Sequence, residues 1–198
     1  MYKEKDMCGR YYIDDDMIDD IRQIVRKLDR KGIRSGDVYP SMEAPVIRAE
    51  QNTAVLMTSK WGFPIDQKLI INAKAETATQ RPLFSHCVQT GRCVIPATGF
   101  YEWKNHKQQY RFYDADGGRI LYMAGLYQYN QMQSQHVILT TAANASMLPV
   151  HDRMPLILTQ SQVEEWLHKP EQATHILSIK PPELERFTEN EQLEFKFE

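Results

Sequence analysis

The sequence lacks any apolar run that approaches the ~20 residues of a membrane span, and its N-terminus lacks the apolar segment of a secretory signal peptide. A transmembrane or secreted protein is therefore not expected, and the expected location is the cytoplasm. Internal repeats and low-complexity linkers are missing too. The 198 residues are expected to fold as one domain, because a chain of this length can bury a core of its own.

Cysteine is scarce, and the three residues present, Cys8, Cys87 and Cys93, are too few and too odd in number for a complete disulfide framework. His86 lies near Cys87 and Cys93, but this spacing matches no usual zinc pattern. We expect no metal and no cofactor. Cys87 and Cys93 are predicted to be buried as small apolar residues. If a cysteine of this chain has a functional role, we expect that role to depend on the reactivity of its thiol and not on a disulfide or a metal.

An excess of basic charge is also missing, since the formal net charge is −2 at pH 7. The chain has no overall signature of a nucleic-acid-binding protein, although a local basic groove remains open. The hydrophobic content of 42% and the charged content of 25% are those of an ordinary globular protein.

Two amphipathic helices are predicted near the ends of the chain. From Ile18 to Leu28, apolar residues recur at helical spacing, with aspartates before them and basic residues at the end. In the segment 161–170, Ser161 and Glu164 have the spacing of a capping box. Residues 35–48, with prolines and a glycine, are expected to be irregular.

The middle of the chain is rich in β-branched and aromatic residues, which indicates strands over 54–63, 91–103, 108–129 and 136–143. Asp-Gly-Gly at 116–118 predicts a hairpin turn inside the third of these segments. The expected fold class is α+β: a twisted, mainly antiparallel sheet that closes toward a barrel, with flanking helices. The last residues, 183–198, are expected to be strand-like or frayed.

Four segments place polar residues in unusual surroundings: MCGRYY, INAKAET, ATGFYEW and HDRMP. Each alone is compatible with a structural role, such as a turn cap or a salt bridge. A nucleophilic Cys8 with His151 and an orienting Glu102 or Asn72 is also possible, because such sets are commonly scattered along a chain. Composition permits this set without selecting it.

Taken together and in this order, the segments resemble the SOS response-associated peptidase (SRAP) family of abasic-site processing proteins, from Met7 to about Trp166. The motifs that carry the resemblance are MCGR at 7–10, WGF at 61–63, NAKAET at 72–77, RCVIPATGFYEW at 92–103, TTAAN at 140–144 and HDRMP at 151–155.

The resemblance implies a catalytic role for Cys8, Asn72, Glu102 and His151, with Cys8 as the nucleophile at the chain terminus. Residues 1–7 would then be a leader that is removed, and residues 8–198 would be a single SRAP-like domain. Two segments depart from the family pattern. Lys74 stands where relatives commonly have arginine, and DVYPS at 37–41 replaces Asn-x-Ala-Pro while keeping the proline.

The implied reaction is chemically reasonable, because an abasic site in DNA opens to an aldehyde and an N-terminal cysteine offers both an amine and a thiol. Together these close a thiazolidine ring. A terminal amine has a pKa near 7.7 to 8.0, so part of it is unprotonated at neutral pH. His151 and Glu102 would move protons, in roles that could be exchanged, and Asn72 would fix the amine or a sugar oxygen. The same groups could cleave the peptide bond ahead of Cys8.

Single-stranded DNA containing abasic sites is the expected partner, because an unstacked lesion enters a pocket without extrusion from a duplex. The chain is expected to be a monomer. Phosphate contacts are predicted for basic residues in or beside the motifs, and tryptophans could stack on bases, with Trp103 the more probable core residue of the two. The predicted DNA-contacting residues are Arg10, Pro40, Trp61, Lys74, Arg92, Thr141 and Arg153. The alternatives are a thiol peptidase acting on other proteins and a non-catalytic single-strand binder.

Overall fold

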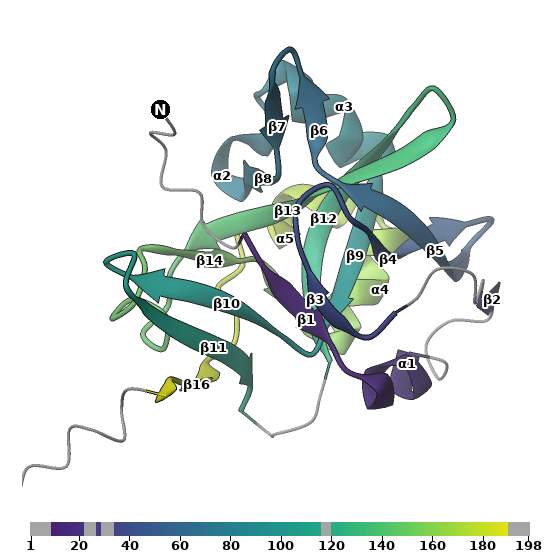
Figure 1. Cartoon of the computed structure of the whole chain (residues 1–198). Coiled ribbons are helices and arrows are strands. Elements are labelled where there is room, and N and C mark those ends of the chain that lie inside the picture. The colour runs from purple at the N-terminus through teal and green to yellow at the C-terminus, as the bar shows by residue number, and fades with distance from the viewer. Residues whose placement is uncertain (1–8, 22–26, 29–33, 116–119, 190–198) are drawn as a thin grey trace, which may run out of the picture.

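The computed structural model of the chain describes residues 9–21, 27–28, 34–115 and 120–189 (Figure 1). These residues form two main sheets, one small hairpin and several short helices around one continuous hydrophobic core. The mixture of strands and helices confirms the predicted α+β class.

The larger sheet closes into a barrel. Its strands pair in the order β5–β4–β9–β12–β13, and β13 pairs back to β5 in parallel, through His136 and Trp61. Each of the other four pairings in this ring is antiparallel. The predicted closure toward a barrel is therefore confirmed. The barrel strands are β4 (Glu43–Glu50), β5 (Thr53–Trp61), β9 (Arg92–Ala97), β12 (Leu121–Asn130) and β13 (Gln133–Ala142).

Short strands extend this barrel at its edges: β2 (Lys27–Leu28) beside β5, β8 (Asn72–Lys74) and β14 (Arg153–Pro155) beside β13, and β15 (Ile157–Leu158) beside β12. A separate hairpin, β6 (Phe63–Ile65) and β7 (Lys68–Ile70), stands at the top of Figure 1.

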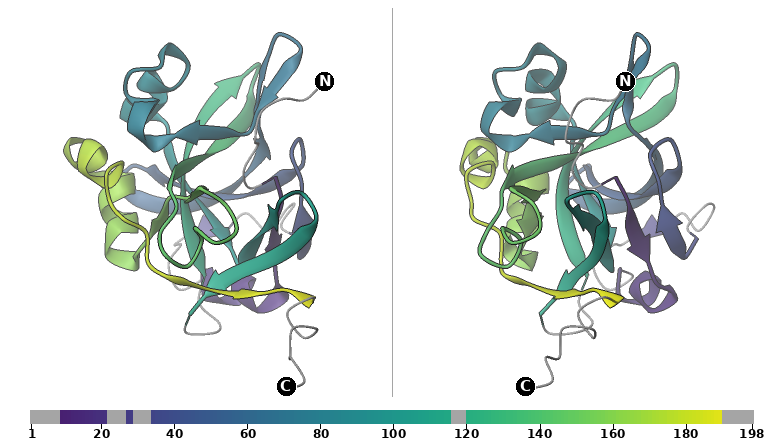
Figure 2. Two further views of the ribbon diagram at one scale, coloured as in Figure 1. Left: turned by 90° about the vertical axis from the view of Figure 1, so that its left-hand side faces the viewer. Right: turned by 60° about the vertical axis from the view of Figure 1, so that its left-hand side comes forward.

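The second sheet has five strands in the order β16–β11–β10–β1–β3 and lies beside the barrel (Figure 2). The strands are β1 (Tyr11–Ile13), β3 (Gly36–Val38), β10 (Gly99–Lys104), β11 (Gln108–Asp114) and β16 (Leu184–Phe187). Its inner face joins the core, where the rings of Phe100 and Phe112 stack with centroids 5.3 Å apart. The strand-like ending predicted for the chain is confirmed by β16, whereas residues 190–198 lie outside the described part.

The helices are short: α1 (Asp15–Ile21), α2 (Ala75–Ala78), α3 (Pro82–Thr90), α4 (Gln160–His168), the 3₁₀ turn η1 (Pro170–Gln172) and α5 (Ala173–Ile176). Helix α4 packs against β9 and β12, and its Trp166 is fully buried. Its capping box is formed by Thr159 and Gln162, not by the predicted Ser161 and Glu164. None of the helices in the described ranges is long and apolar enough to cross a membrane.

Two local predictions are wrong because pairing with distant strands overrides local composition. The helix predicted from Ile18 to Leu28 ends at Ile21 within the described residues, and Lys27–Leu28 forms β2 beside β5; residues 22–26 lie outside the described part. The segment expected to be irregular contains β3 and most of β4, in which Val46 and Ile47 are fully buried in the barrel.

The predicted hairpin between β11 and β12 is also wrong. Strand β11 pairs with β10 and β16, whereas β12 pairs with β9, β13 and β15. The chain therefore crosses from one sheet to the other between Asp114 and Leu121, and the turn sequence at 116–118 lies outside the described residues.

Candidate functional site

The segment Asn72–Lys74 is held at the edge of the barrel as β8. It pairs in parallel with Ile138–Thr140 of β13, and helix α2 begins immediately after it at Ala75. On the other edge of β13, residues 140–142 pair with β14. Two segments that are almost 80 residues apart in sequence are thereby brought to the same end of β13.

An ion pair joins these two segments. Arg153 at the start of β14 reaches Glu76 in α2, with Nη1 2.6 Å from Oε1 and Nη2 2.9 Å from Oε2. The same Nη2 donates to the carbonyl oxygen of Thr140 at 2.7 Å. Burial alone raises the pKa of the Glu76 carboxyl, but hydrogen bonds from Arg153 and the backbone, with the charge of Arg153, leave that pKa below its ordinary value. The pair fixes α2 against β14 in a bidentate geometry.

His151 lies two residues before β14. Its Nδ1 lies 3.0 Å from the backbone nitrogen of Arg153 and 3.1 Å from Oδ1 of the exposed Asp152. When Nδ1 accepts from the Arg153 amide, the neutral ring carries its proton on Nε2. When the ring is protonated, Asp152 stabilises the imidazolium. These two contacts fix the orientation of the imidazole ring.

Glu102 lies on β10 of the second sheet and is 5% exposed. Its Oε1 accepts a hydrogen bond from the backbone nitrogen of Trp103 at 3.1 Å. The N-terminal strand runs alongside, because the backbone nitrogen of Tyr101 donates to the carbonyl oxygen of Arg10 at 2.9 Å. Cys8 and the predicted leader 1–7 lie outside the described residues, whose first member, Gly9, adjoins this strand pair.

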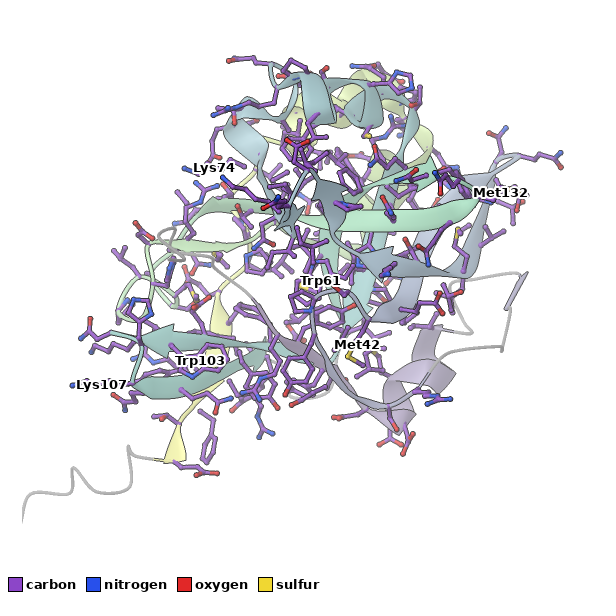
Figure 3. The ribbon with its side chains drawn as sticks, turned by 45° about the horizontal axis from the view of Figure 1, so that its top comes forward. Met42, Trp61, Lys74, Trp103, Lys107 and Met132 are labelled. Carbon is purple, nitrogen blue, oxygen red and sulfur yellow. The ribbon has the colours of Figure 1, made fainter. Side chains whose placement is uncertain are left out.

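Arg10 is fixed on the outer face of the second sheet. Its Nη1 lies 3.3 Å from Oδ2 of Asp37 and 3.1 Å from the hydroxyl of Tyr39, and its Cζ lies 4.1 Å from the ring centroid of Tyr101. The Trp103 ring centroid is 5.1 Å from the same Cζ, and Trp103 is partly exposed. The expectation that Trp103 is a core residue is therefore wrong, because its ring is partly exposed and lies against Arg10. Figure 3 labels Trp103 on β10.

Trp61 cannot offer a stacking surface as predicted. It is fully buried, its ring packs 5.2 Å from that of Tyr11, and its Nε1 donates to the carbonyl oxygen of Ile71 at 3.0 Å. As the last residue of β5, it points into the core where the barrel closes (Figure 3).

Arg92 is also removed from the predicted DNA-contacting set, because it is only 9% exposed. Its guanidinium donates to carbonyl oxygens at the C-terminal ends of two helices. These acceptors are Val88 (2.9 Å) and Gln89 (2.7 Å) in α3, and Trp166 (2.6 Å) in α4. The terminal carbonyls of a helix lack partners within the helix, so Arg92 has a structural role.

The remaining predicted contacts differ in accessibility. Lys74 is exposed and forms no ion pair with any described residue. Pro40 is partly exposed in the turn between β3 and β4. Thr141 is 9% exposed, and its hydroxyl lies 3.5 Å from Oε1 of Glu76, which makes it a poor phosphate contact.

The other two cysteines are inert. Cys87 and Cys93 are buried, as predicted, and burial raises the pKa of both thiols, so that neither forms a thiolate readily. Within the described ranges, no group of three or more His, Cys, Asp or Glu side chains could hold a metal ion.

Comparison with known proteins identifies the family. A family model described as "SOS response associated peptidase (SRAP)" matches residues 7–193. The chain belongs to the SRAP family. The resemblance seen in the motifs is therefore confirmed, and the match to the SRAP model covers nearly the whole chain.

Several SRAP relatives are named abasic site processing proteins. One is YoaM of Bacillus subtilis (strain 168), 34% identical over 182 residues, which cover 82% of this chain and 79% of YoaM. Another is YedK of Escherichia coli (strain K12), 27% identical over 179 residues, which cover 82% of this chain and 80% of YedK.

Solved structures share the SRAP fold. A protein from Bacteroides thetaiotaomicron superposes with a TM-score of 0.76 at 22% identity, covering 96% of this chain and 95% of that one. A phage-related protein from Bordetella bronchiseptica superposes with a TM-score of 0.74 at 24% identity, covering 91% and 93%.

The structure thus places Lys74 opposite Thr140, whose carbonyl oxygen accepts from Arg153, and Asn72 two residues earlier in β8 opposite Ile138. Glu102 lies beside the N-terminal strand, in the other sheet. Sequence reasoning missed the partnership of Glu76 with Arg153. Both residues lie inside quoted SRAP motifs, but only the parallel pairing of β8 with β13 makes them neighbours.

Proposed function

We propose that this protein forms a covalent thiazolidine link between Cys8 and the ring-opened aldehyde of an abasic site in single-stranded DNA. The observation that carries the proposal is the SRAP match over residues 7–193, together with relatives named abasic site processing proteins. Cys8 follows the first matched residue, Met7. The link would shield the lesion from cleavage and from error-prone copying.

The reaction balances with no cofactor. The α-amine of Cys8 adds to the aldehyde carbon, and loss of water gives an imine. The Sγ thiolate then adds to the imine carbon, and the imine nitrogen takes up a proton as the five-membered ring closes. Both new bonds go to the same carbon, so an N-terminal cysteine is required, and an internal cysteine offers only the thiol.

The proton transfers are assigned to His151 and Glu102. Opening of the sugar hemiacetal needs a base at the hydroxyl and an acid at the ring oxygen, and loss of water from the carbinolamine needs an acid again. The imidazole of His151 has both a donor and an acceptor nitrogen, and its loop is anchored through Arg153. Asn72, in β8, is assigned to hold the amine or a sugar oxygen.

Removal of residues 1–7 is the second part of the proposal. The Cys8 thiolate can attack the carbonyl carbon of Met7, which breaks the peptide bond and leaves the Cys8 amine free. Water then hydrolyses the resulting thioester, releasing the leader and regenerating the thiol. Loss of Met7 as an initiator residue would expose the same amine in a chain that begins there.

The decisive experiment compares two forms of the protein on a denaturing gel, after incubation with a single-stranded oligonucleotide carrying one abasic site. The form that begins at Cys8 is expected to give a shifted covalent band without reductant. A form that carries one additional, N-acetylated residue before Cys8 has no free Cys8 amine and is expected to give no covalent band.

Two variants sharpen this test. Cys8→Ala is expected to lose the stable band, and Cys8→Ser, which keeps the amine but not the thiol, should give a band only when borohydride reduces the imine. A full yield of stable band from Cys8→Ala would refute the thiazolidine. Cleavage of a casein substrate with no DNA band would favour a thiol peptidase instead.

A further inference from the structure

The outer face of the five-stranded sheet carries a row of side chains that alternate between aromatic and cationic. Tyr101 of β10 is opposite Arg111 of β11, and Arg111 is opposite Phe187 of β16. On the other side, the amide of Tyr101 bonds to Arg10, and Arg10 bonds to the hydroxyl of Tyr39. We call Tyr39, Arg10, Tyr101, Arg111 and Phe187 the arginine–aromatic row.

The row is held together by stacking. The Cζ of Arg10 lies 5.7 Å from the ring centroid of Tyr39 and 4.1 Å from that of Tyr101. The Cζ of Arg111 lies 5.6 Å from the ring centroid of Phe187 and 5.6 Å from that of Tyr12. These contacts orient both guanidinium groups with little loss of their capacity to donate hydrogen bonds.

Arg111 is the unsatisfied member of the row. It is exposed and makes no ion pair and no hydrogen bond through its side chain with any residue in the described ranges. Arg10, in contrast, is paired with Asp37. Phe187 is 43% exposed beside Arg111, so its ring is accessible to a stacking partner.

An open pocket of about 440 Å³ lies over this part of the row. Its lining includes Arg10, Tyr101, Lys107, Arg111 and Phe187. This volume falls within the ~300–1,000 Å³ of small-molecule sites, which is room for one nucleotide. Three cations and two aromatic rings around one hollow match a phosphate and a stacked base.

We propose that the arginine–aromatic row binds the single-stranded DNA that flanks the abasic site, with a base against Phe187 and a phosphate on Arg111. The inference rests on the proposed function, because Arg10 belongs both to the predicted lesion contacts and to the row. Five strands span four spacings of ~4.8 Å, or roughly 19 Å, which corresponds to about six nucleotides at the ~3.4 Å rise of a stacked strand. Acidic Glu189 also lines the pocket, where it is outnumbered by the three cations.

The test uses fluorescence anisotropy with two labelled probes: an intact oligothymidylate of fifteen nucleotides, and a trinucleotide with the abasic site at its centre. Arg111→Ala is expected to weaken binding to the long probe about fivefold and to lower the slope of log affinity against log salt by about 0.7. Phe187→Leu keeps the apolar cover of the strand but loses the ring, and it should weaken long-probe binding about fivefold or more.

Lys68→Ala serves as the matched charge control. Lys68 is exposed in the β6–β7 hairpin, which stands at the top of Figure 1, away from the five-stranded sheet. The affinity of Lys68→Ala for the long probe is expected to equal that of the unchanged protein. The melting temperatures of Lys68→Ala, Arg111→Ala and Phe187→Leu are expected to agree within a few degrees.

Two outcomes would overturn the inference: long-probe affinities for Arg111→Ala and Phe187→Leu equal to that of the Lys68→Ala control, or equal losses on the long probe and on the trinucleotide. Failure of the proposed function would look different, because the unchanged protein would then form no covalent band with the abasic trinucleotide or with the abasic oligonucleotide of the crosslinking experiment.

Discussion

Buried His136 makes the stability of this protein depend on pH, in a direction set by its surroundings. The side chain is fully buried where β13 pairs with β5, and neither ring nitrogen has a hydrogen-bonding partner of good geometry within the described residues. Burial lowers the pKa of His136 to about 3, and the backbone of Ser59 opposes this shift only in part. The imidazole is therefore neutral in the folded protein at any pH near neutrality.

The magnitude follows from linkage. In the unfolded chain the pKa of a histidine is about 6.5, so below that pH the unfolded state binds a proton that the folded state refuses. Because the folded pKa is the lower one, stability is present above pH 6.5 and is lost as pH falls toward 3. Between pH 7 and pH 4.5 the free energy of unfolding should fall by about 2 to 3 kcal/mol on account of His136 alone.

The assay is urea unfolding followed by tryptophan fluorescence at pH 7, 6, 5 and 4.5, for the unchanged protein and for His136→Gln. The free energy of unfolding of the unchanged protein minus that of His136→Gln should decrease by about 1.4 kcal/mol per pH unit below pH 6.5, because the contributions of other groups cancel in the difference. His175→Gln, which alters an exposed histidine in α5, should keep the pH dependence of the unchanged protein. Parallel curves for the unchanged protein and His136→Gln would show that the buried ring does not titrate as argued.

Four further substitutions test the structural assignments. Arg92→Met removes the donors that cap two helices and should lower the free energy of unfolding by about 2 to 4 kcal/mol, with unchanged single-stranded DNA affinity of the folded protein; reduced affinity at full stability would return Arg92 to the DNA-contacting set. Trp61→Phe should lower the free energy of unfolding in urea by about 1 to 3 kcal/mol and leave the DNA affinity unchanged. Trp103→Phe should lower the DNA affinity in anisotropy titrations and leave the free energy of unfolding unchanged. Identical behaviour of the two variants would contradict the difference in burial. Gly125→Ala would place a Cβ 2.8 Å from the carbonyl oxygen of Val137 and should lower the free energy of unfolding by about 1 to 3 kcal/mol, so a melting temperature equal to that of the unchanged protein would refute the close strand approach.

The sequence predicts the strands well where the residues themselves prefer extended structure. The segments around Val55, Val94 and Val137 are β-branched runs that lie in the barrel, and all of them form strands. Prediction fails where a partner decides the outcome. Residues 43–50 contain a proline, yet they form β4 because β5 and β9 pair on either side of them.

The same distinction holds at the site. Motif resemblance named Asn72, Glu102 and His151, but exposure could not be read from residue type. Trp61 and Trp103 have the same side chain and a similar sequence setting, and only the position of each in its sheet decides which one reaches the surface. A cross-strand row such as the one through Arg111 cannot be predicted from the sequence. Its members become neighbours only through the register of the paired strands, and they have no regular spacing along the chain.

Closure of the barrel has a consequence for how the protein folds. The parallel pairing of His136 with Trp61 joins residues 75 positions apart. Closing this long loop lowers the conformational entropy of the chain before the new contacts stabilise it. Strand β8 is held by the same β13, only a few residues further along. We therefore expect barrel closure to be a late, slow event, on the millisecond-to-second scale of all-β domains. A nascent or partly unfolded chain would then lack the docking of Asn72 and Glu76, so that the site in which Asn72 is proposed to act would be assembled only after the barrel has closed.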